Sequence, residues 1–428
     1  MIIDLRNCLR LHDNPLLDGV QQPLLVWICE DIRWSRMSPR RQQFTRQAVA
    51  DLREQARELG GDVVVRVGDR VQHLRQLAEQ TGLGIRVSAC SGWDERQQDV
   101  ELGAERIDAN SLYQATDLPF DQVPEPFTKF RNQVQKKVPV HTPLAIPAAL
   151  SPLPAGVDAG DLPQAAEIES DPRAVMKFVG GESAALAHLT HYLSDPRRPT
   201  TYKETRNGLL GADYSTKFSP WLAQGSLSAR QIWHAVSEFE RTVHKNDSTY
   251  WIKFELLWRE YFHWWVQSWG AGLYAADPKA KHYEPSWQAW SEAETGVPFI
   301  DANMLELIQT GFMSNRGRQN VASFLAKDLG LDYRLGADFF EYHLLDYDHA
   351  SNWGNWAYVA GVGADPRDDR WFNVMLQATR YDKRGGYVRH WLPHLENVDT
   401  AQIHWPWVSG SASQPIVAPS GWNKVIRG

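Results

Sequence analysis

The chain carries two patterns of hydrophobic and polar positions, one on each side of a proline-rich stretch. Toward the N-terminus, short continuous apolar runs alternate with amphipathic stretches such as 39–59. Such runs are typical of strands buried on both faces, and their alternation with helices predicts a parallel sheet. The expected strands cover residues 1–5, 23–29, 62–68 and 85–90. Because no G-x-G-x-x-G follows the first strand, we predict a Rossmann-like α/β domain over residues 1–115 that lacks the dinucleotide fingerprint.

The rest of the chain predicts a connector and a helical domain. Prolines recur through residues 116–184, where periodic apolar stretches are few, so we expect a long surface connector that can contain short helices. After it, apolar positions recur at helical spacing, which predicts an all-helical domain over residues 185–428. Ser228 and Asp301 precede two of the helical stretches and are expected helix caps.

Composition narrows the class of protein. The 428 residues, 43% of them hydrophobic, suffice for two or three globular domains. No run of eighteen apolar residues occurs and two charged residues fall within the first six, so we expect a cytoplasmic protein without a membrane span. Three cysteines without a C-x-x-C are typical of reduced thiols. The net charge of -7 argues against non-specific coating of nucleic acid but leaves room for a local basic groove.

The 19 tryptophans are unusual, and some gather beside two acids in LLDYDHASNWGNWAYVAG at 344–361. Asp346 and Asp348 could bind a divalent metal, but metal sites usually gather further oxygen ligands, and the neighbours here are rings and amides. Alternatively, one carboxylate accepts from a heterocycle or a ribose hydroxyl while the other pairs with an arginine such as Arg318. We favour this interpretation and expect no metal.

The predicted helix 249–269 places Glu255, Trp258 and Arg259 on one face. Glu255 therefore lies either on an exposed stripe, paired with arginine, or in an apolar pocket, where burial would raise its pKa.

Two polar segments could contact a phosphate or a base. In GFMSNRGRQ at 311–319, Asn315 and Gln319 can meet base edges and the arginines can meet phosphates, although a polar helix start explains the segment equally well. YSTKFS at 214–219 offers hydroxyls and backbone N–H groups ahead of a helix, which suits a phosphate but is a weak signal alone.

Several long segments resemble the photolyase and cryptochrome family. LRNCLRLHDNPLL is similar to the family's first-strand signature. The blocks similar to its flavin-binding half are TYKETRNGLLGADYSTKFSPWLAQGSLS, FELLWREYF, TGFMSNRGRQNVASFLAKDLG and DYDHASNWGNWAYVAGVGADPRDDRWFN. Within the family, YKETRNG, SNRGRQ and NWAYVAGVG most resemble the cryptochrome DASH branch. The resemblance implies an α/β N-terminal domain and an all-α C-terminal domain that binds FAD.

The resemblance also implies which residues hold FAD. Those expected at its phosphates and sugar are Tyr202, Ser215, Thr216, Lys217, Phe218 and Ser219. Those expected around its ring and adenine side are Arg259, Arg318, Asp346, Asp348 and Asn352, with Asn352 beside the flavin N5.

In photolyase relatives, reduced FAD excited by blue light donates an electron to a cyclobutane pyrimidine dimer flipped out of DNA, and the electron returns after the dimer splits. By resemblance, Glu255 would hydrogen-bond the dimer, Trp258 and Tyr358 would form aromatic walls, and Asn315 and Gln319 would line the cleft. The DASH branch is associated with single-stranded DNA, for which a stacking cleft with a basic rim suffices. Candidate rim cations are Arg206, Lys217, Arg316 and Arg389.

Trp356 matches the flavin-proximal tryptophan of the family's photoreduction chain. The next position carries Tyr333, and no tryptophan stands in register at the outer position, where Trp287 is displaced and Trp290 matches a different family position. Because tyrosine is harder to oxidise unless its proton can leave, we expect photoreduction that is either slower or rerouted, with Trp353 or Tyr333 as the candidate route.

The family often carries an antenna chromophore, such as the folate methenyltetrahydrofolate. Asp94 and Glu95 stand where antenna contacts are expected, although a solvated helix start is the alternative.

Three functions fit these observations. The first is a light-driven lyase that repairs cyclobutane dimers in single-stranded or looped DNA, acting as a monomer. The second is a flavin photoreceptor or transcriptional regulator with little or no repair. The third disregards the resemblance and takes the chain as an aromatic-rich helical binding protein fused to an α/β domain. Glu255, Trp258, Asn315 and Gln319 favour the first, because a sensor needs no lesion cleft.

Overall fold

The N-terminal part of the molecule is a parallel sheet flanked by helices. The computed structural model describes residues 1–275, 284–363 and 371–426. The strands are β1 (Ile2–Asp4), β2 (Leu24–Cys29), β3 (Val63–Val67), β4 (Ile85–Ser88) and β5 (Glu105–Ile107). They pair in the order β3-β2-β1-β4-β5, and every neighbouring pair is parallel. The predicted α/β fold is confirmed.

The fifth strand was missing from the sequence prediction. It is a three-residue edge strand, and its residues Glu105 and Arg106 are exposed. A polar edge strand carries no apolar run, so periodicity cannot distinguish it from a loop. The helices of this part are α1 (Asp31–Ser35), α2 (Pro39–Glu58), α3 (Arg70–Thr81) and α4 (Trp93–Glu101).

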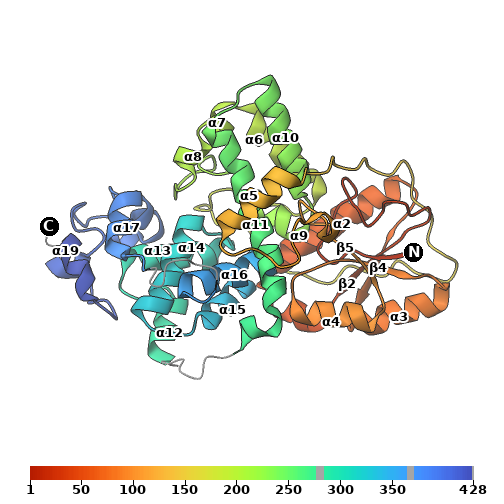
Figure 1. Cartoon of the computed structure of the whole chain (residues 1–428). Coiled ribbons are helices and arrows are strands. Elements are labelled where there is room, and N and C mark those ends of the chain that lie inside the picture. Colours follow the sequence, from red (N-terminus) through yellow and green to blue (C-terminus); the bar gives the residue numbers. More distant parts are fainter. Residues whose placement is uncertain (276–283, 364–370, 427–428) are drawn as a thin grey trace.

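The connector contains one substantial helix, α5 (Phe127–Lys137), and the rest of the chain is helical, as predicted (Figure 1). Its α-helices are α6 (Glu182–Ser194), α7 (Arg197–Thr200), α8 (Tyr202–Thr205), α9 (Ser219–Gln224), α10 (Ala229–Thr242), α11 (Asp247–Trp269), α12 (Glu284–Ser291), α13 (Pro298–Thr310), α14 (Asn315–Ser323), α15 (Tyr333–His343), α16 (His349–Ala360), α17 (Val374–Tyr381), α18 (Gly386–Trp391) and α19 (Asn423–Ile426). Short 3-10 helices are η1 (Ala115–Asp117), η2 (Gly270–Tyr274), η4 (Pro393–Leu395), η5 (Pro406–Ser409) and η6 (Ser420–Trp422), and η3 (Phe324–Asp328) is a short π-helix. None of the helices in the described ranges is long and apolar enough to cross a membrane.

One of the two expected helix caps is confirmed. The Ser228 hydroxyl accepts from the N–H of Gln231 at 2.9 Å and caps α10. Asp301 was placed wrongly, because it lies inside α13 rather than before it. Its carboxylate instead reaches back and accepts from the N–H groups of Thr295 and Gly296 at 2.9 and 3.0 Å.

Buried polar contacts hold the α/β part against the helical part. Glu260 of α11, fully buried, accepts from the N–H of Leu112 at 2.8 Å and from Trp264 Nε1 at 2.7 Å. Asp13 and Arg230 form a second buried pair across this boundary at 2.7 Å. Because a buried charge without a partner is costly, these pairs fix α10 and α11 relative to the sheet. They thereby fix the site that α11 lines.

Candidate flavin and lesion site

A cavity of about 620 Å³ opens in the helical part. Residues from α8, α9, α11, α14 and α16 and from the loop before α9 line it. Of the residues predicted from the sequence, it brings together Tyr202, Arg206, Ser215, Thr216, Lys217, Phe218, Ser219, Glu255, Trp258, Arg259, Asn315, Arg318, Gln319, Asp346, Asp348, Asn352, Trp356 and Tyr358. Segments separated by more than a hundred residues thus form one site of a size typical for ligand pockets.

The start of α16 fixes two polar groups on the cavity wall. Asp348 is its N-cap, and the Oδ1 of this carboxylate accepts from the N–H of Ser351 at 2.8 Å. Arg259 lies 3.4 Å from the other carboxylate oxygen and also donates to the Asn110 carbonyl at 2.7 Å. Burial acts to raise the pKa of Asp348, but Arg259 and the Ser351 N–H outweigh it and hold this pKa below its ordinary value. Asp348 therefore stays ionised.

Asp346 pairs with Arg318 at 2.8 Å, as the sequence suggested. The two acids of the D-x-D thus bind different arginines, and the described residues include no cluster of His, Cys, Asp and Glu arranged to hold a metal. The second oxygen of Asp346 is buried without a hydrogen-bond partner, and so are Gln319 Oε1 and the Tyr214 hydroxyl. All three residues line the cavity. Unpartnered buried polar atoms at a cavity wall indicate that a polar ligand completes the site.

Lys217 lies in the cavity wall and not at its rim, so its interpretation as a rim cation was wrong. Its side chain is buried, its backbone has φ of 52°, and its Nζ lies 3.4 Å from the Tyr214 ring centroid. The Nζ donates to the Ala212 carbonyl at 2.7 Å. Burial lowers the pKa of Lys217 to about 7. A desolvated ammonium of this kind favours an anionic ligand.

The cavity mouth carries the expected carboxylate and aromatic walls. Glu255 forms an ion pair with Arg206, and its side chain is 31% exposed. Burial raises the pKa of Glu255, while Arg206 opposes this shift. The rings of Trp258 and Tyr358 meet edge to face with centroids 6.0 Å apart. Phe127 of the connector stacks on Trp258 at 3.7 Å, a contact that no sequence pattern indicated.

Two predicted rim cations lie outside the cavity lining. Arg316 donates to Asn207 at 2.9 Å and lies over the Tyr381 ring. Arg389 donates to the carbonyls of Arg384 and Val398, so it holds the C-terminal segment instead of the rim.

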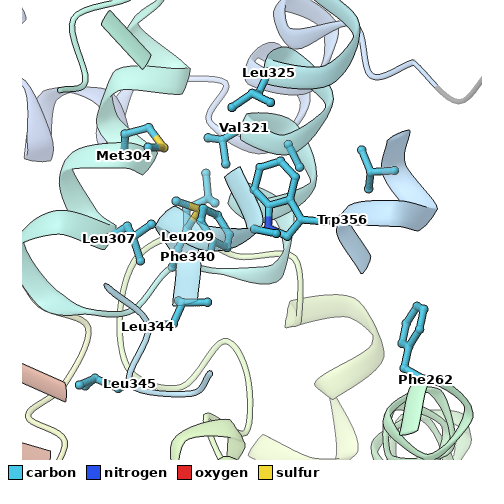
Figure 2. Packing of buried hydrophobic residues seen from close by; sticks show 14 of the residues in the cluster. Leu209, Phe262, Met304, Leu307, Val321, Leu325, Phe340, Leu344, Leu345 and Trp356 are labelled. Carbon is cyan, nitrogen blue, oxygen red and sulfur yellow. The ribbon is translucent and has the colours of Figure 1, made fainter. Parts of the chain in front are cut away.

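Trp356 begins a row of three indoles that leads from the cavity wall toward the surface. Its ring centroid lies 6.2 Å from that of Trp290, which in turn stacks on Trp287 at 5.5 Å. Trp290 is fully buried and Trp287 is half-buried. Figure 2 shows the Trp356 indole in the hydrophobic cluster with Val321 and Phe340.

The alternative relay residues have less favourable surroundings. The Tyr333 hydroxyl donates to the Leu273 carbonyl at 2.9 Å, and the Arg334 guanidinium lies 4.6 Å from its ring. A carbonyl is a poor proton acceptor and a nearby cation opposes loss of an electron, so both make Tyr333 harder to oxidise. Trp353 packs on Tyr274 at 5.0 Å, outside the described cavity lining. The route through Trp353 or Tyr333 stays a prediction, and the ring geometry favours Trp290 and Trp287.

The antenna residues lie on α4, away from this cavity. Glu95 pairs with Arg33 at 2.5 Å, and Asp94 is exposed in the first turn. Although burial acts to raise the pKa of Glu95, Arg33 lowers it to about 2. Their antenna role stays a prediction.

Comparison with known proteins identifies the family of this site. A family model described as the FAD binding domain of DNA photolyase matches residues 251–425, and one described as DNA photolyase matches residues 2–150. A Gloeobacter violaceus protein named Cryptochrome DASH is 43% identical over 94% of this chain and 87% of its own. This chain belongs to the photolyase and cryptochrome family. A Xenopus laevis Cryptochrome DASH is 40% identical over 99% of this chain and 90% of its own.

Solved structures of family members share the whole fold. A cryptochrome of Synechocystis sp. PCC6803 superposes with a TM-score of 0.90 at 37% identity, covering 100% of this chain and 97% of that one. A class III photolyase of Agrobacterium tumefaciens gives 0.81 at 26% identity, covering 99% and 95%. The α/β part and the helical FAD-binding domain are therefore those of photolyases and cryptochromes.

The cavity fits FAD. The unpartnered Asp346 oxygen can accept a hydrogen bond from a ring N–H or a ribose hydroxyl, and the Tyr214 hydroxyl can donate or accept one. Lys217 offers a buried cation to the phosphates. Asn352 donates to the Ala337 carbonyl at 2.9 Å, which leaves its own carbonyl oxygen for the ligand. Sequence reasoning gave no role to Tyr214 or Phe127; the first is the opening residue of the selected YSTKFS motif, while only tertiary packing reveals the second.

Proposed function

We propose that this protein is a blue-light-driven, FAD-dependent lyase that splits cyclobutane pyrimidine dimers, with a preference for single-stranded or looped DNA. One observation carries the proposal: a single cavity is lined both by Asp346 and Asp348, expected at FAD, and by Glu255 and Trp258, expected at the lesion. A pyrimidine pair that enters this mouth would lie against the cofactor.

Bound reduced FAD would supply the light-driven electron that opens the dimer. The chain's own residues would bind the dimer and stabilise the charge that develops on it. Trp258 and Tyr358 provide two nearly perpendicular aromatic surfaces, which hold a flipped pyrimidine pair and exclude water. A carboxyl with a raised pKa, such as Glu255, can donate a hydrogen bond to a dimer carbonyl. Arg206 would then be released to a phosphate.

The preference for single strands rests on the cost of extracting the lesion. Flipping a base pair from a duplex costs a few kcal/mol of stacking and pairing, and a single strand avoids much of this cost. Aromatic walls bind unstacked bases without sequence preference. We also propose that the protein acts as a monomer. We place it in a reducing, cytoplasmic compartment, since the three cysteines are free.

The test is blue-light repair of a thymine-dimer oligonucleotide, single- and double-stranded, by the reduced protein. Leaving a buried dimer carbonyl without its hydrogen bond costs about 1–3 kcal/mol, so Glu255→Ala should lower the repair rate by about five- to a hundredfold at unchanged FAD content. Glu54→Ala, at an exposed position of α2, is the control and should repair normally. Equal repair by both variants would refute the role of Glu255.

The alternative is a flavin photoreceptor, as the name of the Synechocystis cryptochrome suggests. No repair of either substrate by FAD-loaded protein, with light-dependent absorbance changes intact, would establish this alternative in place of the lyase.

A further inference from the structure

We propose that α5, the helix of the connector, is a nucleic-acid-binding surface that holds the phosphate backbone of a DNA strand beside the cavity mouth. The helix has the sequence FTKFRNQVQKK, with four cations and no acid. The cations are Lys129, Arg131, Lys136 and Lys137. None of them takes part in an ion pair recorded for the described part of the chain. This proposal rests on the proposed function, since it takes DNA as the partner.

The helix lies along the part of α11 that forms the mouth. Phe127 stacks on Trp258 at 3.7 Å, and the Arg131 guanidinium lies 5.4 Å from the Phe254 ring centroid. One turn further on, Gln135 accepts from the Tyr250 hydroxyl at 3.2 Å. Residue numbers therefore rise along α5 while those of its partners on α11 fall, so the two helices run antiparallel. Figure 1 shows α5 beside α11. Trp258 and Phe254 both line the cavity.

The charges of α5 are not arranged for helix stability. Cations near a helix C-terminus interact favourably with its dipole, which accounts for Lys136 and Lys137. The same dipole disfavours Lys129, which lies in the first turn, where no acid compensates it. Arg131 is half-buried, and its Nε has no hydrogen-bond partner. A helix that keeps such cations in a chain of net charge -7 is better explained by an anionic partner.

The spacing of the exposed lysines suits a nucleic-acid strand. Lys129 and Lys136 are both exposed and lie seven residues apart, which is about 10 Å along a helix. About three nucleotide steps of 3.4 Å span the same length. Next to this face of α11, Lys203 and Arg206 lie over the Trp251 ring, at 5.1 and 5.5 Å, and the Trp251 ring centroid is 4.7 Å from that of Phe254. Cations from two segments therefore lie over neighbouring rings of α11, where a strand that passes over the mouth would meet both.

The test measures binding of an undamaged single-stranded oligonucleotide in the dark, between 50 and 200 mM salt, by fluorescence anisotropy. Each phosphate contact contributes about 0.7 to the slope of log affinity against log salt, so Lys129→Gln/Lys136→Gln should lower the slope by about 1.4. The loss of affinity should accordingly be about sevenfold larger at 50 mM than at 200 mM salt. The matched control is Arg46→Gln/Lys424→Gln, which removes two exposed cations on α2 and α19.

A lower slope for the α5 variant alone, with FAD content and Tm unchanged, supports the proposal. An unchanged slope, or an equal fall for the control, overturns it, because general electrostatics would then explain binding. Weaker binding to anionic lipid vesicles with normal oligonucleotide binding would overturn it as well. Since no light and no lesion are used, failure of repair leaves this result intact, and the two proposals fail separately.

Discussion

The pair of Arg318 and Asp346 offers a sharp test of how the cavity wall is stabilised. The Asp346 side chain is 2% exposed and the Arg318 side chain 24%, and they meet at 2.8 Å. Arg318→Met leaves a carboxylate buried without its partner, which should lower the free energy of unfolding by about 3–5 kcal/mol. Asp346→Asn leaves a guanidinium that water reaches and that still donates to the Met313 carbonyl at 2.9 Å, so we expect a loss of about 1–2 kcal/mol.

The double variant separates the pair from its surroundings. Because Arg318→Met/Asp346→Asn buries no charge, it should be about 2 kcal/mol more stable than the sum of the two single effects predicts. The assay is urea unfolding of FAD-free protein, repeated with FAD, which binds only the folded state and raises stability by mass action. Arg75→Met is the control: its partner Glu101 lies 2.9 Å away, but both side chains are half exposed, so we expect about 0–1 kcal/mol. Equal losses for Arg318→Met and Asp346→Asn, or simple additivity, would refute the burial asymmetry.

Three further predictions concern the same cavity. With a thiol reductant and blue light, Trp290→Phe and Trp287→Phe should each slow reduction of bound oxidised FAD, because each interrupts the indole row; an unchanged rate for Trp290→Phe would contradict that route. Burial lowers the pKa of Lys217 to about 7, so above this pH the Lys217 amine must take up a proton when an anionic ligand binds. FAD affinity, followed by flavin fluorescence, should then fall by about tenfold per pH unit above pH 7 and stay level below it, and Lys217→Met should abolish this slope. Gly336→Ala would place a Cβ 2.2 Å from the Trp356 ring and should cost about 1–3 kcal/mol of stability in thermal unfolding; a loss below 0.5 kcal/mol would mean that the wall yields easily.

The sequence determined the elements and most of the residues at the site. Its buried strands are continuous apolar runs and its long helices have a clear apolar period, so local pattern alone predicts them. Motif resemblance selected Asp346, Asp348 and Glu255, and all three line one cavity. The sequence did not predict the edge strand β5, because a short exposed strand has no apolar signature.

Only the tertiary structure decided how these residues work together. Burial depends on what other segments cover a side chain, so Lys217 could be taken for a rim cation until its neighbours were placed. Contacts between distant segments, such as Phe127 on Trp258, leave no periodic trace in the chain. The same holds for Trp290 and Trp287: the sequence did not assign them to the relay, and they form a row with Trp356 only because the fold brings Trp290 of α12 within 6.2 Å of the Trp356 ring. Local pattern fixes which face of an element is apolar, while the packing of the elements fixes which side chains meet and how water is excluded from them.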